Sequence, residues 1–345
     1  MKETNNFLAH FIFHLFGIMS VLVPIVLDID AEMFCFSVAA CPSLGVFTVS
    51  YCSGGCVHLV DVFDLDPKEL VIGGGLQRRC TLGCPGSCYM GFRFENSRGR
   101  MAFTDATSTH TCLLLLADAT CVHIIDVLSK THMGFLYPPE YIPYPSAIAA
   151  QAGYVAVTRG YELLRTRDVV LFVGSGLSWV PHCIVASSLT QITGLSFASD
   201  RKSIVMCEAK LSWFSRLSEF RVSDGCLLGS TDHFETSHQD VVECEEGWLL
   251  ACGGHEGGVW LYPRDRQGGC IKQVMAMKSA YSIAVVQGGC LCTGFQDKGS
   301  NHSGLYVLTS KDVIAMARMS LQRLGWLVAI VRSMLWWAKR KFPAV

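Results

Sequence analysis

The sequence predicts an all-β fold, a six-bladed β-propeller, with a C-terminal amphipathic helix and an apolar N-terminal segment. Three observations support this prediction. Short apolar runs recur in groups of three along the chain. The last four intervals between these groups are about 40 to 50 residues, the length of a four-stranded propeller blade. A parallel α/β fold would need a helical pattern of about 10–15 residues between strands, and none is found before residue 312.

Each predicted unit contains a central apolar run, a partner run that closes on a turn, and a third short strand ahead of both. The central runs are VFTVSY (46–51), LLLLAD (113–118), YVAVTRG (154–160), SIVMCEA (203–209), WLLACGG (248–254) and CLCTGF (290–295). The third strands are MFCFSV, GRMAFTD, SAIAAQ, TGLSFAS, DVVECEE and YSIAVVQ. Gly-Gly pairs between several runs fit tight connections. Six units predict six blades, because each unit is one small sheet.

One heptad occurs twice, as CVHLVDV at 56–62 and CVHIIDV at 121–127. A repeated Cys-x-His pair could bind a metal, but His58 and His123 also occupy equivalent positions of equivalent predicted strands. We interpret the heptads as the same strand in the first two blades. Their long offset then indicates an insertion between DVFDLDP and GFRF, which contains Cys80, Cys84 and Cys88.

The composition restricts the class of partner and the compartment. The chain has 345 residues, with 28 basic against 29 acidic side chains and 17 cysteines. Without a cluster of Lys and Arg to neutralise phosphates, DNA is not expected as a partner and RNA is disfavoured. Many cysteines stand inside strand-like apolar runs, where a free thiol behaves as a small hydrophobe. A reduced, cytoplasmic or cytosol-facing domain is therefore expected.

The two ends differ from the repeats, and we divide the chain into residues 1–30, 31–311 and 312–345. Residues 7–27 carry no Asp, Glu, Lys or Arg and are long enough to span a membrane as a helix. A segment that packs on the domain, with VLVPIVL as a strand, and a cleaved signal peptide are the alternatives. Residues 312–342 predict a Trp-rich cationic helix that either covers the domain or lies on a membrane surface.

Two stretches resemble NHL repeats: GFRFENSRGRMAFTD…LLLLADATCVHIIDV, and ITGLSFASDRKSIVMCEA…LSEFRVSDG. The resemblance covers about residues 33–320 and is to a divergent group from protists and algae. The Asn-x-Arg that usually follows the Asp of an NHL blade is missing from every unit, so the repeats are degenerate. The resemblance implies a six-bladed ring that mostly binds protein or RNA, with a few enzymatic relatives.

Sites for metal chemistry are sparse. Cys80, Cys84 and Cys88 have a spacing that zinc permits, but Gly83, Pro85 and Gly86 indicate an irregular loop without a zinc-ribbon pattern. Propellers of the gluconolactonase type, which NHL folds resemble, hold an axial divalent cation with Glu, Asp and Asn. Asp105, Asp118 and Glu208 are the candidate acids for such a site, with no matching Asn among them. Asp118 and Glu208 stand at the family's usual structural Asp position.

We therefore expect a non-catalytic module without cofactor that binds a protein partner through its blade loops. Rigid blades would hold the recognition loops in place. The alternative is a metal-dependent hydrolase or lactonase. Membrane association through the two ends would change the context of either function.

Overall fold

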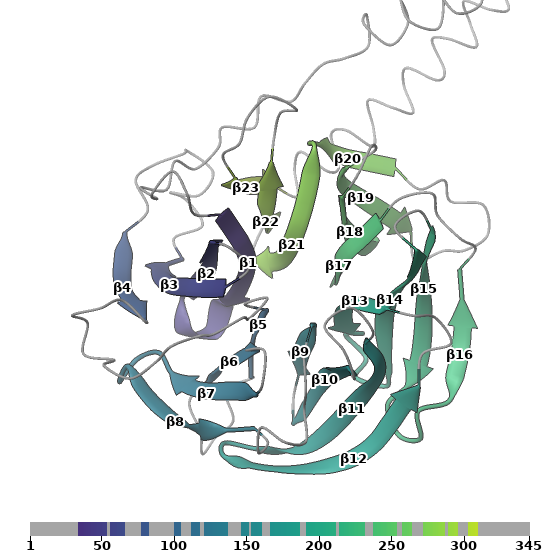
Figure 1. The fold of residues 1–345 in the computed structure, drawn as a ribbon, viewed down its shortest axis with the longest axis horizontal. Helices are drawn as coiled ribbons and strands as arrows, with labels where there is room; N and C mark the ends of the chain where they lie inside the picture. Colours follow the sequence, from purple (N-terminus) through teal and green to yellow (C-terminus); the bar gives the residue numbers. More distant parts are fainter. Residues whose placement is uncertain are drawn as a thin grey trace, which may run out of the picture.

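A computed structural model describes residues 34–53, 56–65, 77–82, 100–104, 112–117, 121–136, 146–151, 153–160, 166–186, 191–211, 214–231, 237–253, 257–263, 272–286, 289–295 and 303–309. These residues form six antiparallel sheets arranged around a central axis as a six-bladed β-propeller (Figure 1). Each sheet is one blade, and its strands follow one another in sequence from the axis outward. The predicted propeller is thereby confirmed.

The strands of the first three blades have the following bounds. Blade 1 contains β1 (Phe34–Cys41), β2 (Val46–Ser53), β3 (Cys56–Asp64) and β4 (Arg78–Leu82), with a 3-10 turn, η1 (Pro42–Leu44), between β1 and β2. Blade 2 contains β5 (Met101–Phe103), β6 (Leu114–Ala117), β7 (Val122–Asp126) and β8 (Thr131–Phe135). Blade 3 contains β9 (Ile148–Gln151), β10 (Tyr154–Gly160), β11 (Thr166–Ser175) and β12 (Ser178–Ala186).

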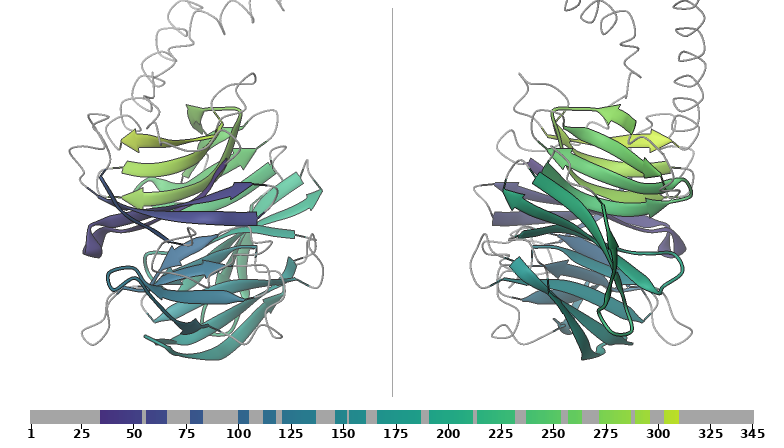
Figure 2. Two further views of the ribbon diagram at one scale, coloured as in Figure 1. Left: turned by 60° about the vertical axis from the view of Figure 1, so that its left-hand side comes forward. Right: turned by 90° about the vertical axis from the view of Figure 1, so that its right-hand side faces the viewer.

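The other three blades complete the circle. Blade 4 contains β13 (Gln191–Phe197), β14 (Ser203–Leu211), β15 (Phe214–Arg221) and β16 (Leu227–Ser230). Blade 5 contains β17 (Ser237–Cys244), β18 (Gly247–Gly253), β19 (Gly258–Pro263) and β20 (Lys272–Ala276). Blade 6 has three strands within the described residues: β21 (Ser279–Val286), β22 (Gly289–Phe295) and β23 (Gly304–Thr309). The side views in Figure 2 show how each sheet twists from its inner to its outer strand.

Six apolar clusters hold the ring together, one between each pair of neighbouring blades. β6 illustrates why the central runs of the sequence are continuously apolar. Leu114 and Leu116 pack toward blade 1, while Leu113 and Leu115 pack toward blade 3. Because successive residues of a strand point to opposite faces, a strand buried on both faces needs apolar residues at every position.

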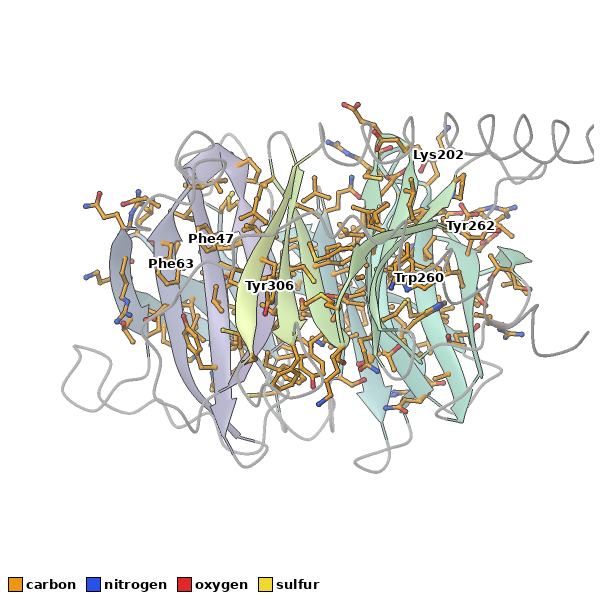
Figure 3. The ribbon with its side chains drawn as sticks, turned by 90° about the horizontal axis from the view of Figure 1, so that it is seen from above. Phe47, Phe63, Lys202, Trp260, Tyr262 and Tyr306 are labelled. Atoms are coloured by element: carbon orange, nitrogen blue, oxygen red, sulfur yellow. The ribbon has the colours of Figure 1, made fainter. Side chains whose placement is uncertain are left out.

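The seam between blades 1 and 6 joins the two ends of the described chain. Phe47 and Phe63 of blade 1 stack with ring centroids 5.1 Å apart and contribute to the apolar cluster that packs on blade 6 (Figure 3). The Cys35 amide donates to Ser303 Oγ at 2.5 Å, and Thr293 Oγ1 donates to the Phe36 carbonyl at 3.1 Å. Side-chain packing and hydrogen bonds therefore close the ring at this seam.

The repeated heptads lie in β3 and β7, the third strands of blades 1 and 2, as predicted. The expectation that Cys80 belongs to an irregular loop was wrong. Cys80 lies in β4 and pairs with Val62 of β3, because blade 1 takes its fourth strand from within the insertion. The apolar N-terminal segment and most of the predicted C-terminal helix lie outside the described residues. No helix in the part of the chain that the structure describes is long and apolar enough to span a membrane.

Candidate functional site

A β-bulge occurs near the start of the inner strand in four blades. The register shifts leave Phe36, Thr193, Gln239 and Tyr281 as the extra residues of β1, β13, β17 and β21. A bulge bends the strand and redirects the extra side chain. In all four blades, the residue after the bulge lies at the same height along the propeller axis.

We call the residues at that level the axial ring. The register of the six inner strands with their second strands assigns one member to each blade. In blades 2 and 3 the assignment follows from Ala117 N–H donating to the Arg100 carbonyl and Thr158 N–H donating to the Ala147 carbonyl. The members, from blade 1 to blade 6, are Ser37, Arg100, Ala147, Gly194, Asp240 and Ser282.

Arg100 is the only long side chain of the ring, and it reaches across the axis. Blades 2 and 5 lie opposite one another, yet Arg100 Nη1 is 3.3 Å from Asp240 Oδ2 (Figure 1). Nη1 also donates to the Tyr281 carbonyl at 2.8 Å, and Nη2 donates to the Gln239 carbonyl at 2.9 Å. One guanidinium thus joins blade 2 to blades 5 and 6, and both carbonyls belong to bulge residues.

Asp240 is held from several sides. Its Oδ2 accepts hydrogen bonds from Ser282 Oγ at 2.7 Å and from the Ile283 amide at 3.2 Å. Burial raises the pKa of Asp240, while Arg100 and these hydrogen bonds oppose the rise. Gly194 leaves room for the Asp240 backbone, because a Cβ at position 194 would lie 2.7 Å from Asp240 Cα. The ion pair therefore depends on a small neighbour in blade 4.

Below the ring lies an axial cavity of about 350 Å³, lined by the inner strands of all six blades. Asp240 lines this cavity, and the other lining residues are mostly Ala, Val, Ile, Ser and backbone. Glu243, three residues further along β17, lines it too and accepts a hydrogen bond from the Ser199 amide. The cavity is therefore lined mainly by apolar side chains, with Asp240 and Glu243 as its carboxylates.

Three aromatic rings and a lysine gather beside Arg100, and we call Phe36, Lys278, Tyr281 and Phe295 the mouth cluster. Phe36 and Tyr281 are bulge residues of neighbouring inner strands, and their rings stack at 5.9 Å. Tyr281 meets Phe295 edge-on at 5.6 Å. The Arg100 guanidinium carbon lies 5.2 Å from the Phe36 ring centre, and Lys278 Nζ lies 5.8 Å from that of Phe295. The bulges therefore build a cationic aromatic surface at this face.

Glu208 and Cys80, two described residues among those singled out from the sequence, are not part of this mouth. Glu208 is fully buried in β14, where Arg216 Nε donates to it at 2.9 Å and Ser218 Oγ also donates to it. Cys80 is half-buried between blades 1 and 2. Cys84, Cys88, Asp105 and Asp118 lie outside the described residues. Within the described ranges, no group of three His, Cys, Asp or Glu side chains is placed to hold a metal ion.

His123 of the second heptad is buried beside other polar and aromatic groups. Its Nε2 is 3.5 Å from Cys121 Sγ, and its ring lies 5.5 Å from that of His132 and 5.2 Å from that of Phe135. Burial and the neighbouring His123 lower the pKa of His132. The side chain of His58 lies outside those that the structure describes.

His238 allows a pH prediction. Burial lowers its pKa to about 4, against 6.5 for a free histidine, so the folded protein holds it neutral. Between pH 6.5 and about 4 the unfolded chain binds one more proton, and the free energy of unfolding should fall as pH falls, by about 3 kcal/mol. In His238→Leu this part of the slope should disappear in urea unfolding measured from pH 7 to pH 4. Leu250→Ala, a destabilised core control, should keep the slope; an unchanged slope in His238→Leu would contradict the assignment.

The mouth residues were missed by sequence reasoning, although a signal was present. Arg100 and Asp240 stand at equivalent places, in GRMAFTD and DVVECEE, three units apart. In a ring of six, units three apart are opposite one another, so opposite charges at these places predict a pair across the axis. The aromatic members lack such a signal, because bulges leave no recognisable trace in single strands.

Comparisons with known proteins agree with the architecture. No protein-family model matches the chain, and no curated protein sequence does either. Among solved structures, the WD40 repeats of RRP9 superpose with a TM-score of 0.54 at 11% identity, covering 80% of each chain. The structure of U3-55K superposes with a TM-score of 0.53 at 10% identity, covering 79% of this chain and 80% of the other. At these identities the likeness shows the fold alone: the chain is a β-propeller.

Proposed function

We propose that the protein is a non-catalytic propeller that binds a protein partner at its axial mouth. The observation that carries the proposal is the mouth cluster, in which Phe36, Tyr281 and Phe295 form a continuous, partly exposed aromatic surface. Aromatic and Arg side chains dominate the binding energy of protein interfaces when rigid neighbours support them. Arg100 supplies that support, since it contacts the Phe36 ring and the Tyr281 carbonyl.

The surrounding structure suits recognition better than chemistry. β1 of blade 1 and β21 and β22 of blade 6 carry the three aromatic side chains, so the geometry of the cluster is set by the packing of two blades and not by one loop. Glu208, the described candidate acid for the alternative hydrolase or lactonase function, is engaged by Arg216 and Ser218. The NHL type of the repeats, the cytosolic location and membrane association stay predictions from the sequence, and the WD40-repeat propellers among the structural neighbours are consistent with a scaffold role.

Alanine substitutions at the mouth test this proposal. A partner captured from an extract of the source organism is purified, and its Kd is measured with the full-length protein. Tyr281→Ala and Phe295→Ala should each weaken binding by about 30-fold, the effect of losing an aromatic hot spot of about 2 kcal/mol.

The matched control is Tyr262→Ala, an aromatic truncation at the end of β19, away from the mouth. Figure 3 shows Tyr262 and Lys202 toward the same edge of the disc. This variant should bind as the wild type does. An unchanged Kd in both mouth variants would overturn the proposal, provided that their thermal unfolding midpoints match the wild type.

A further inference from the structure

Lys278 has no carboxylate partner among the described residues. Arg100, the other cation beside the mouth cluster, is paired with Asp240. The exposed Lys278 instead has its ammonium over the Phe295 ring. Among the described residues, the mouth therefore presents one positive charge without a paired carboxylate, beside aromatic rings.

The backbone fixes where this charge stands. Lys278 lies in the two-residue link between β20 and β21, and the preceding residue, Met277, is buried. A Cβ at Gly257 would lie 2.0 Å from the Lys278 carbonyl oxygen, and one at Gly294 would lie 2.1 Å from the Ser279 carbonyl oxygen. Only glycine permits such close backbone approach. The backbone at Lys278 and at the next residue is thus closely packed against two glycines.

Among the described residues, Lys278 is the charged group of the mouth that is available to a partner. Arg100 and Asp240 neutralise each other, and Ser282 and backbone groups occupy the remaining acceptor positions of Asp240. Neither of them supplies a counter-ion to Lys278 or a second free cation. Charge complementarity at the mouth therefore favours an anionic group on the partner, flanked by side chains that pack on the aromatic rings.

We propose that the mouth binds an acidic segment of a protein partner, with an Asp or Glu carboxylate on Lys278 and an apolar or aromatic side chain against Phe36 and Tyr281. This inference rests on the proposed function, because it names the partner chemistry of the same site. The rival occupant is a basic segment whose Lys or Arg displaces Lys278 from Phe295, since an aromatic face also attracts cations. The two occupants predict opposite effects when the Lys278 charge is removed.

The test selects binders from a phage library of random dodecapeptides on the full-length protein. Wild-type protein should enrich peptides that combine Asp or Glu with apolar residues. Synthetic copies of these peptides should bind Lys278→Ala about 5-fold more weakly at low salt, and this difference from the wild type should shrink at high salt, as expected for an exposed ion pair. Selection on Lys278→Glu should enrich Lys and Arg instead.

Lys202→Glu is the matched control, because Lys202 is exposed near the opposite ends of the inner strands. Its selected peptides should match those of the wild type. Basic peptides that bind Lys278→Ala more tightly would overturn the acidic partner in favour of the basic one. Peptides that require Tyr281 but show no charge preference would overturn this inference and leave the proposed function standing. Peptides indifferent to Tyr281→Ala, or no selected peptides at all, would count against both.

Discussion

Arg100→Met should lower the free energy of unfolding by about 3–5 kcal/mol at neutral pH, because it leaves the largely buried Asp240 carboxylate without its cation. The substitution keeps an unbranched apolar stem of similar reach, so the loss measures the charge and its three contacts and not an empty space. Chemical denaturation followed by tryptophan fluorescence would give this difference. We expect the effect to be among the largest for any single polar side chain in the protein.

The pH dependence separates a charge effect from a packing effect. Without Arg100, the already raised pKa of Asp240 should rise further, and protonation of the carboxylate should relieve the strain of burying it. The deficit of Arg100→Met should therefore shrink as the pH is lowered from 7 to 5. The double variant Arg100→Met, Asp240→Leu should be more stable than the two single losses added together. A deficit that is constant with pH and additive with Asp240→Leu would refute the ion-pair explanation.

Arg221→Met serves as the comparison. Arg221 Nη1 is 2.8 Å from Asp224 Oδ2, but both side chains are largely exposed. This variant should leave the unfolding midpoint unchanged, because exposed pairs contribute little. The contrast with Arg100 would show that the axial position, and not ion pairing as such, makes the difference.

Glu208→Ala should lower the free energy of unfolding by a similar amount, about 3–5 kcal/mol. The carboxylate has no exposed surface. Its loss removes the acceptor of the half-buried Arg216 guanidinium and of the buried Ser218 hydroxyl inside blade 4. Thermal and urea unfolding would measure the loss. Glu219→Ala, which removes a hydrogen bond from Ser203 at 2.7 Å on the neighbouring strand, should cost only about 1 kcal/mol.

A chelator tests the other role considered for Glu208. If Arg216 and Ser218 are its partners in solution, EDTA should leave the unfolding midpoint of the wild type unchanged, and added calcium or zinc should not raise it. The structural role would be contradicted if added metal raised the unfolding midpoint of the wild type but not that of Glu208→Ala. Glu208 would then be a ligand of a cation.

The blade pattern could be predicted because it follows from burial. Runs such as LLLLAD and WLLACGG are apolar at successive positions, and only a strand covered on both faces requires this. The order of the strands in a blade then follows from the order of the runs. The boundary of the insertion was misplaced at Cys80, because Gly83, Pro85 and Gly86 suggested a loop that extended too far back. Cys80 belongs to a strand because β4 pairs with β3, and a short sequence does not reveal which strand it pairs with.

The mouth could not be predicted in the same way, because it depends on bulges and on closure of the ring. Phe36 and Tyr281 are far apart in sequence and become neighbours only when blade 6 packs on blade 1. Neither the sequence MFCFSV nor the sequence YSIAVVQ indicates that it contains a bulge, or that the bulge residues Phe36 and Tyr281 lie beside one another. Arg100 and Asp240 were within reach, since their equivalent places could have been compared across units. Sequence reasoning treated these places as strand starts and did not compare them.

The axial ring has a consequence for how such a protein can diversify. Each blade contributes one residue to it, and that residue is separate from the six apolar clusters that hold the blades together for all members except Ala147. Most ring positions can therefore change without altering the apolar clusters between the blades, although Arg100 and Asp240 are tied to one another by their ion pair. The freedom to change is uneven. Gly194 is closed to larger residues by the Asp240 backbone, and Ser282 is held by its hydrogen bond to Asp240, whereas the Ser37 hydroxyl contacts only that of Ser282 among the described side chains. New specificities should thus arise first beside the seam, where the mouth cluster already lies.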